Sequence, residues 1–249
     1  MEVKVLEEKG NELKLLFKKA DTAMVNSLRR AIMNHVPTLA IENVSIYENS
    51  SVLFDEFLAH RLALLPLTMD PKSYKKGDKV KLYLKVQGPC IVYSKDIKSA
   101  DPKIQVVDKN IPIVKLGEGE RIRLEAEAVV GIGKEHVKWQ PAVVGFQNLP
   151  KLEISEECNL CGECIKSCPK GILEEKAKKI VMKDATECIL CKNCRDSCSK
   201  KALKLDIDKN SFIFYMETHG GLTNRDILKQ AVKELKAKVE EFQKSFKEI

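Results

Sequence analysis

Hydrophobic and charged residues alternate with a period of two at the start of the chain, which is typical of half-buried strands. The alternating apolar positions are Val3, Val5, Leu13, Leu15 and Phe17. Between the two runs, the sequence Lys9-Gly10-Asn11 is typical of a tight turn. Residues 2–18 are therefore predicted to form a β-hairpin.

After residue 20, the spacing of apolar residues changes from two residues to the three or four residues typical of a helix. Asp21 is suited to cap this helix, and Pro37 is expected to stop it. The apolar face is predicted to consist of Met24, Leu28, Ala31 and Ile32. The pattern returns to a strand from Leu39 to Tyr47, and a second helix is predicted from Asp55 to about Leu64, before Pro66.

Strand patterns dominate residues 79–144. Apolar residues recur within residues 80–86, 104–106 and 122–130, with glycine and proline between the runs. This middle part is predicted to be a mostly β domain. A further strand is predicted from Phe212 to Glu217, followed by a break at Gly220-Gly221.

The chain ends in a long predicted helix. Thr223 and Asp226 have the spacing of a capping box at its start. Apolar residues then follow at intervals of four and three, at Leu228, Val232, Leu235, Val239, Phe242 and Phe246. This narrow seam favours a coiled-coil-like contact with a partner helix, and packing on the chain's own domain is the alternative; both can hold.

Cysteine spacing is the strongest chemical signal in the chain. Eight of the nine cysteines form two runs of the pattern C-x2-C-x2-C-x3-C. They are Cys158, Cys161, Cys164 and Cys168, and then Cys188, Cys191, Cys194 and Cys198. Such runs hold four-iron, four-sulfur clusters in two-cluster ferredoxins, where the fourth cysteine of each run binds the other cluster.

Two 4Fe-4S clusters are therefore predicted. The first is assigned to Cys158, Cys161, Cys164 and Cys198, and the second to Cys188, Cys191, Cys194 and Cys168. Pro169 follows the first run as the pattern prefers, whereas Ser199 follows the second. This departure leaves open whether one cluster is labile or incomplete.

Zinc and disulfides are the competing interpretations. A zinc site could use Cys161 and Cys164 with Cys188 and Cys191, but this would leave four cysteines without a role. Disulfides need an oxidising compartment, and residues 1–9 alternate charged and aliphatic residues instead of forming the apolar core of a signal peptide. The sequence therefore favours iron-sulfur clusters and a cytoplasmic location.

Composition is that of an ordinary globular protein. The chain has 249 residues, of which 44% are hydrophobic and 32% charged, and no run approaches the length of a membrane span. The formal net charge is +7, but most lysines alternate with Glu or Asp and only 6% of residues are aromatic. This pattern favours a solvated surface over direct contact with nucleic acid.

Several stretches resemble the α-like assembly subunits of cellular RNA polymerases. They are Asn26-Ser27-Leu28-Arg29-Arg30-Ala31-Ile32 within residues 21–37, Ala40-Ile41-Glu42, and Asp55-Glu56-Phe57-Leu58-Ala59-His60-Arg61-Leu62. The stretch Gly133-Lys134-Glu135-His136-Val137-Lys138-Trp139-Gln140-Pro141 is similar to a signature of the archaeal and eukaryotic branch. A ferredoxin-like insert after it resembles the archaeal D-type members.

The resemblance implies an α+β fold with a dimerisation domain built from both chain ends. The implied domains are 1–47 with 209–249 for dimerisation, an inserted β-rich domain at 48–150, and an iron-sulfur domain at 151–208. The implied partners are a small α-like subunit of the L type and the large catalytic subunits. A role as a ferredoxin-type electron carrier, or as the electron-wiring subunit of a redox enzyme, is the alternative function.

No catalytic constellation is predicted on this chain. Gly131 and Gly133 lack the spacing of a phosphate-binding loop. The resemblance implies that Arg29 and Arg30 face the large subunits, although a solvated pair is the alternative. His60 and His136 are predicted to be packed or surface residues, Cys90 a buried thiol, and Trp139 a packing residue.

Overall fold

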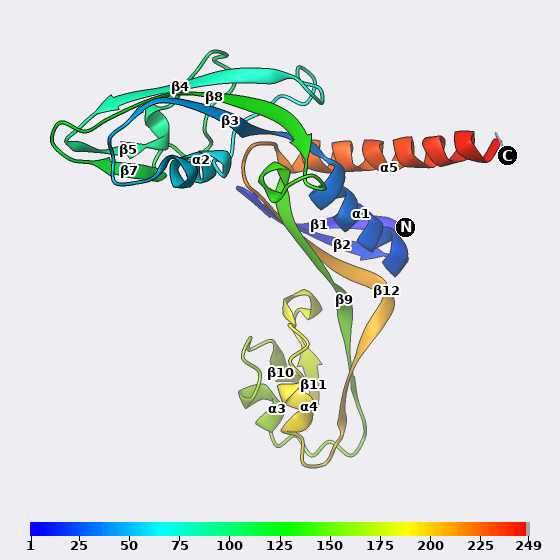
Figure 1. The fold of residues 1–249 in the computed structure, drawn as a ribbon. Coiled ribbons are helices and arrows are strands. Elements are labelled where there is room, and N and C mark those ends of the chain that lie inside the picture. The colour runs from blue at the N-terminus through cyan, green and yellow to red at the C-terminus, as the bar shows by residue number, and fades with distance from the viewer. Residues whose placement is uncertain (248–249) are drawn as a thin grey trace. The chain divides into compact units, whose positions relative to one another are not determined.

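The computed structural model describes residues 1–247 of an α+β protein (Figure 1). Two compact units divide the chain. The first consists of Met1–Glu7, Lys14–Asn26 and Gly145–Tyr215, and the second of Glu8–Leu13, Ser27–Val144 and Met216 onward. No helix in the described residues combines the length and apolar character needed to cross a membrane.

The sheet of the first unit begins with the predicted hairpin. Its strands are β1 (Glu2–Lys9), β2 (Glu12–Lys18), β12 (Leu203–Thr218) and β9 (Ala142–Ile154). They are hydrogen-bonded in the order β1-β2-β12-β9. Leu15 and Phe17 are buried, and the ring of Phe17 meets that of Phe214 on β12 edge to face. The alternation of apolar and charged residues on β2 therefore marks the buried face of this sheet.

Helix α1 (Thr22–His35) lies where the sequence predicts it, but one member of its predicted apolar face is wrong. The side chain of Met24 is 43% exposed, whereas Val25 is completely buried. Val25, Leu28 and Ile32 are spaced three and four residues apart, so they form one stripe that excludes Met24.

The second unit holds an antiparallel sheet in the order β3-β8-β4-β6. Its strands are β3 (Pro37–Asn49), β8 (Arg121–Ile132), β4 (Lys79–Gln87) and β6 (Lys98–Ser99). Strands β5 (Cys90–Tyr93) and β7 (Pro112–Leu116) form a second pair, and α2 (Asp55–Ala63) packs against β3 and β7 (Figure 1). The mostly β character of this part is confirmed. Short 3-10 turns occupy Ser94–Asp96 and Val137–Trp139.

Two predictions in this unit are wrong. Residues 104–106 form no strand; Val106 makes an isolated bridge to Leu67, and Ile104 is fully buried by tertiary packing. Cys90 is exposed instead of buried, because it stands at the first position of β5, where its thiol faces the carbonyl oxygen of Gln87 at 3.7 Å.

Trp139 packs on the backbone of β8, as predicted. Its side chain is 7% exposed, and its Nε1 donates a hydrogen bond to the carbonyl oxygen of Val129 at 2.9 Å. A Cβ atom at Gly131 would lie 2.4 Å from the indole ring, so a glycine is required where the ring crosses the strand.

The cysteine-rich segment contains two short helices and one hairpin. They are α3 (Glu163–Lys166), α4 (Asn193–Asp196), and the pair β10 (Leu173–Lys176) and β11 (Lys179–Met182), with a 3-10 turn at Ala185–Glu187. In Figure 1 this segment connects the end of the long strand β9 to the start of β12, and these two strands lie side by side. The strand predicted at 212–217 is longer than expected, because β12 begins at Leu203 and continues through Asp208 without a break.

Helix α5 (Asn224–Lys247) confirms the predicted terminal helix. The hydroxyl of Thr223 accepts a hydrogen bond from the backbone N–H of Asp226 at 3.2 Å and donates one to its carboxylate at 2.7 Å. These two bonds begin the helix as the sequence predicts.

Candidate functional site

The two cysteine loops adopt the same backbone conformation, 30 residues apart. Leu160 and Leu190 have left-handed φ values of 58° and 55°, and Gly162 and Lys192 have values of 75° and 67°. Each loop then enters a four-residue helix, α3 or α4, that carries the third cysteine of its run. The sequence repeat is therefore also a structural repeat, which brings the first three thiols of each run to one turn.

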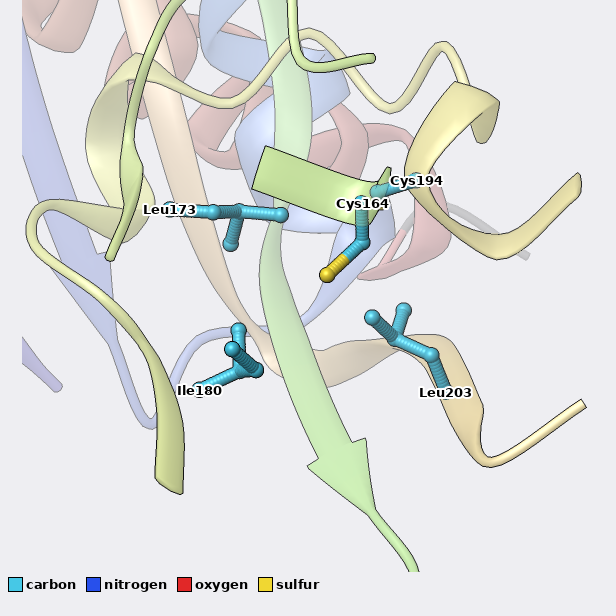
Figure 2. Packing of buried hydrophobic residues seen from close by; sticks show 5 residues of the cluster. All are labelled: Cys164, Leu173, Ile180, Cys194 and Leu203. Carbon is cyan, nitrogen blue, oxygen red and sulfur yellow. The ribbon is translucent and has the colours of Figure 1, made fainter. Parts of the chain in front are cut away.

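A small buried core joins the two loops. It consists of Cys164, Leu173, Ile180, Cys194 and Leu203, whose side chains converge in Figure 2. Cys158, Cys168 and Cys198 pack against it and are partly buried. The core thus contains the third cysteine of each run and borders the fourth of each.

The second predicted set of ligands lines one pocket. Cys168, from the first run, lies there with Cys188, Cys191 and Cys194 from the second run. Ile172, Leu173, Met182 and Leu205 complete the walls with apolar side chains. The chain path therefore places the fourth cysteine of the first run beside the three thiols of the second.

Burial and mutual repulsion act on the thiols of this pocket. Burial raises the pKa of Cys194, and negative charge on Cys188, Cys168 and Cys191 raises it further. The pKa of Cys188 is also raised, mainly by burial and then by charge on Cys191 and Cys168. Such a set is unfavourable as free thiolates, and iron ions that neutralise the charge would relieve the repulsion.

The first predicted set is brought together in part. Burial raises the pKa of the Cys164 thiol, and charge on Cys158 and Cys161 adds to the rise, so these three thiols lie near one another. Cys158 and Cys198 both pack against the shared core, whereas Cys161 is exposed and is not among the residues packed on it.

The donor set fits iron-sulfur cubes. Each thiolate of a four-iron cluster binds a different iron corner, so the thiols must surround a space and need not converge on one ion. Among residues 1–247, no three His, Cys, Asp or Glu side chains converge on a point where one metal ion could sit. The eight cysteines would hold the clusters, which supply redox-active iron when bound.

Polar contacts tie the second cysteine loop to the sheet of the first unit. The amide of Gln147 on β9 donates a hydrogen bond to the carbonyl oxygen of Cys188 at 2.8 Å. Lys14 on β2 forms an ion pair with Glu187, and its ammonium lies 5.5 Å from the ring centre of Tyr215 on β12. Sequence reasoning missed these residues, because their partners are far away along the chain.

The hydroxyls of Ser167 and Ser197 lie 2.9 Å apart and join the ends of α3 and α4 by a hydrogen bond. Each serine directly precedes the fourth cysteine of its run. The repeat in the sequence contains the signal for this contact, since both positions hold serine in the same place.

The predicted seam of α5 is largely exposed. Ile227 and Ala231 are fully buried at the base of the helix, whereas the side chains of Val232 and Phe242 are 44% and 70% exposed. The exposed seam continues through Val239 and Phe246, and the rings of Phe242 and Phe246 stack at 6.3 Å. A contiguous exposed apolar stripe of this kind is typical of an interaction surface.

The arginines and histidines singled out by the sequence lie at or near the surface. Arg30 is exposed, and Arg29 is half-buried with its guanidinium 3.4 Å from the sulfur of Met33. His60 is exposed, and His136 is exposed with its Nδ1 accepting a hydrogen bond from the backbone N–H of Lys138 at 3.1 Å. Both histidines therefore lie at the surface, which is one of the two placements predicted for them.

Lys138 is a structural residue that sequence reasoning did not single out. Only 9% of its side chain is exposed, and its ammonium donates a hydrogen bond to the carbonyl oxygen of Ile41 at 3.0 Å and pairs with Glu42. The same ammonium lies 4.5 Å from the ring centre of Trp139. Two of the stretches that carry the family resemblance therefore meet at this side chain.

Two family profiles match adjacent parts of the chain. Residues 44–150 match the RNA polymerase Rpb3/RpoA insert domain, and residues 157–203 match the 4Fe-4S dicluster domain. An Rpb3/RpoA-type insert followed by a dicluster segment defines an α-like RNA polymerase subunit with a ferredoxin-like domain.

Curated relatives match almost the whole chain. The protein from Methanosarcina acetivorans named DNA-directed RNA polymerase subunit Rpo3 is 43% identical over 97% of this chain and 96% of its own length. The Rpo3 subunits of Archaeoglobus fulgidus and Pyrococcus furiosus are 40% and 37% identical, over 100% and 97% of this chain and 98% and 95% of their own lengths. The chain belongs to the Rpo3 family of archaeal DNA-directed RNA polymerase subunits.

Proposed function

We propose that this chain is a non-catalytic assembly subunit of DNA-dependent RNA polymerase. In this role it forms a heterodimer with a small α-like subunit of the L type, and the pair is the platform for the large catalytic subunits. The near full-length similarity to Rpo3 subunits is the observation that carries this proposal. The chain works in the cytoplasm and makes no direct contact with nucleic acid.

The exposed seam of α5 supports a helical partner. Without a partner, the seam would leave four large apolar side chains in water, those of Val232, Val239, Phe242 and Phe246. Burying such side chains contributes about 1.5–3 kcal/mol each. We assign this seam to the small α-like subunit, in a dimerisation domain formed by residues 1–47 and 209–249.

The basic pair of α1 and the aromatic pair at the start of α2 support contact with large subunits. Arg30 is exposed, and the side chains of Phe54 and Phe57 are 71% and 61% exposed, with ring centres 6.5 Å apart. Exposed aromatic and arginine side chains are frequent anchors of protein interfaces. The large subunits would also contribute the polymerase active site, so no catalytic residue is assigned to this chain.

Two 4Fe-4S clusters would stabilise the inserted domain at residues 151–208, between the β-rich domain at 48–150 and the last strand. The buried core of this segment is small, and two of its five members are cysteines. Metal-thiolate bonds therefore supply much of its folding free energy, as they do in other small metal-binding domains. The pocket formed by Cys168 with Cys188, Cys191 and Cys194 supports the exchange of fourth ligands between runs.

The electron-carrier alternative accounts for fewer of the observations. It explains the cysteine runs, but gives no role to the seam of α5 or to the polymerase insert domain at residues 44–150. The assembly role explains all three features.

The seam provides the direct test of the heterodimer. The double variant Val232→Glu with Leu235→Glu places two charges on the seam and should abolish binding to the small α-like subunit in a pull-down. The matched control, Ala237→Glu with Lys244→Glu, adds the same residues at exposed positions outside the seam and should bind as wild type. Undiminished binding of the seam variant would exclude this interface.

A chain with all eight cluster cysteines replaced by serine tests the structural role of the clusters. Polymerase reconstituted with it should assemble in lower yield, because residues 151–208 lose their clusters. Nucleotide incorporation per assembled complex should stay close to wild type. Normal yield with catalysis lost per complex would instead indicate a direct redox or catalytic role.

A further inference from the structure

A cleft of about 620 Å³ in the second unit has no role in the proposed heterodimer. One wall is the loop from Met69 to Lys76, between α2 and β4, and the other is the beginning of α5 from Asp226 to Glu234. Pro37, at the start of β3, also lines it. Both walls belong to the same compact unit.

Five lysines converge on this cleft. Lys72, Lys75 and Lys76 come from the loop, and Lys229 and Lys233 come from α5. Among the described residues, only Lys76 of these five has an ion-pair partner, with Glu135 at 2.6 Å. The other four ammonium groups form no ion pair within the described residues, although the charge of Lys72 adds to the hydrogen bond from Ser73 in lowering the pKa of Asp70.

Two acidic residues also line the cleft. The carboxylate of Asp226 accepts a hydrogen bond from the hydroxyl of Thr223, and that of Glu234 accepts one from the amide of Gln230 at 2.7 Å. These neutral donors leave both carboxylates charged, but five lysines against two carboxylates still give the cleft an excess of positive charge.

Lysines on the neighbouring sheet behave differently. Lys79 and Lys81 on β4 pair with Glu127 and Glu125 on β8, at 2.9 and 2.6 Å. On this sheet the chain itself therefore supplies a carboxylate partner for each of the two lysines. Like charges gathered without such partners repel one another, and an anion bound between them removes the repulsion.

The loop wall is held in place before any ligand binds. Tyr74 donates a hydrogen bond to Asp101, and Asp70 accepts one from the hydroxyl of Ser73 at 2.7 Å. The backbone N–H of Met69 donates to the carbonyl oxygen of Gly221 at 3.0 Å, which ties the loop to the segment before α5. A preformed site loses little conformational entropy on binding.

We propose that this cleft binds an acidic segment of a partner polypeptide. Its cations are all lysines, which act as point charges for carboxylates, and it offers no arginine fork of the kind that recognises phosphate or guanine. Its one aromatic residue, Tyr74, is fixed by Asp101 and half-buried, so the cleft has no free ring for stacking on bases. Met69, Pro71 and Pro37 add apolar surface for the stems of Glu and Asp side chains.

This inference goes beyond the assembly role and does not depend on it. The partner is defined by chemistry alone, as a polypeptide segment rich in Asp and Glu, whichever complex it belongs to.

Fluorescence anisotropy with the full-length chain and a labelled twelve-residue poly-glutamate peptide tests the proposal. Wild type should bind the peptide with an affinity that falls as salt increases. Lys72→Glu with Lys75→Glu, and separately Lys229→Glu with Lys233→Glu, should each weaken binding roughly tenfold or more, since each removes one charged wall. The milder Lys72→Gln with Lys75→Gln variant should weaken it less, and it serves if a charge reversal disturbs folding.

The matched control is Lys85→Glu with Lys115→Glu, two exposed strand positions of the same unit outside the cleft. It should bind as wild type. Replacing cleft lysines relieves their repulsion, so the cleft variants should have thermal midpoints at or above that of wild type. A labelled oligonucleotide of twelve thymidines tests the competing ligand. Equal loss in cleft and control variants, or tighter binding of the oligonucleotide than of the peptide at the same salt, would overturn the proposal.

Discussion

Lys14 on β2 forms an ion pair with Glu187, the residue that directly precedes Cys188. Only 12% of the lysine side chain is exposed, against 48% for the glutamate. Together with the hydrogen bond from Gln147 to Cys188, this pair connects the second cysteine loop to the strands of the first unit. The stability of that loop is therefore linked to the sheet beside it.

A double-mutant cycle on Lys14→Met and Glu187→Gln measures this link. Because the pair is only partly shielded from water, its coupling free energy is expected to be about 1 kcal/mol. Denaturant unfolding followed by cluster absorbance provides the measurement. The same cycle on Lys166 and Glu163, an exposed pair on α3, should give a coupling close to zero. Equal couplings in the two cycles would contradict a special role for Lys14.

Single cysteine variants should differ in iron content according to whether the replaced cysteine is assigned to a cluster. Cys168→Ser should remove the cluster otherwise held by Cys188, Cys191 and Cys194, so iron should fall from about eight to about four atoms per chain. Cys90→Ser should leave the iron content unchanged, because Cys90 is exposed on β5 and belongs to neither run. Anaerobically purified protein with two zinc ions and no acid-labile sulfide would exclude the assignment.

Backbone strain should distinguish the two cysteine loops. Lys192 adopts φ 67° at the position where the first loop has Gly162, and a left-handed conformation is costly for a residue with a Cβ atom. Lys192→Gly should therefore stabilise the loop by up to about 1 kcal/mol, seen as a higher midpoint for thermal loss of cluster absorbance. Lys200→Gly removes the same charge without relieving a left-handed residue and should lower the midpoint slightly. A lower midpoint for Lys192→Gly would show that strain is unimportant there.

The hydrogen bond from Tyr74 to Asp101 predicts a pH range within which it stabilises the loop from Met69 to Lys76. This loop is one wall of the cleft on which five lysines converge, called the lysine cleft below. This bond raises the pKa of Tyr74 from 10.0 to about 12, and it lowers the pKa of Asp101 below 3.8. The stabilisation that comes from the raised pKa of Tyr74 is complete below pH 10 and is lost as pH rises through about 12. The stabilisation that comes from the lowered pKa of Asp101 is complete above pH 3.8 and is lost as pH falls below that value.

Tyr74→Phe should therefore be less stable than wild type between these limits, and the difference should shrink outside them. Thermal unfolding across pH measures this, and alkaline absorbance titration of Asp101→Asn should show the Tyr74 pKa shifted back toward 10.0. A difference that does not change with pH would exclude the hydrogen bond as its cause.

The sequence predicted those features that depend on local pattern. The hairpin at residues 2–18, the helix after Asp21 and the capping box of Thr223 all follow from the period or from side chains a few residues apart. The cysteine runs indicate 4Fe-4S chemistry for the same reason, because their spacing is local, and residues 157–203 match the 4Fe-4S dicluster domain.

Features that depend on residues far away along the chain could not be predicted from local sequence pattern. Met24 and Val25 are both apolar, and only the packed structure shows which one is buried. Residues 104–106 have a strand-like pattern but no neighbouring strand with which to form a ladder. The lysine cleft joins residues about 150 positions apart, so the sequence shows its lysines only as part of a general positive charge.

Purification of the tagged chain from its native cell under anaerobic conditions tests the assembly role most directly. Mass spectrometry of the bound proteins should be combined with iron and sulfide analysis. We predict the small α-like subunit and the large polymerase subunits in stoichiometric amounts, with about eight iron atoms and eight sulfides per chain. Recovery of a redox enzyme in place of polymerase subunits would contradict the account.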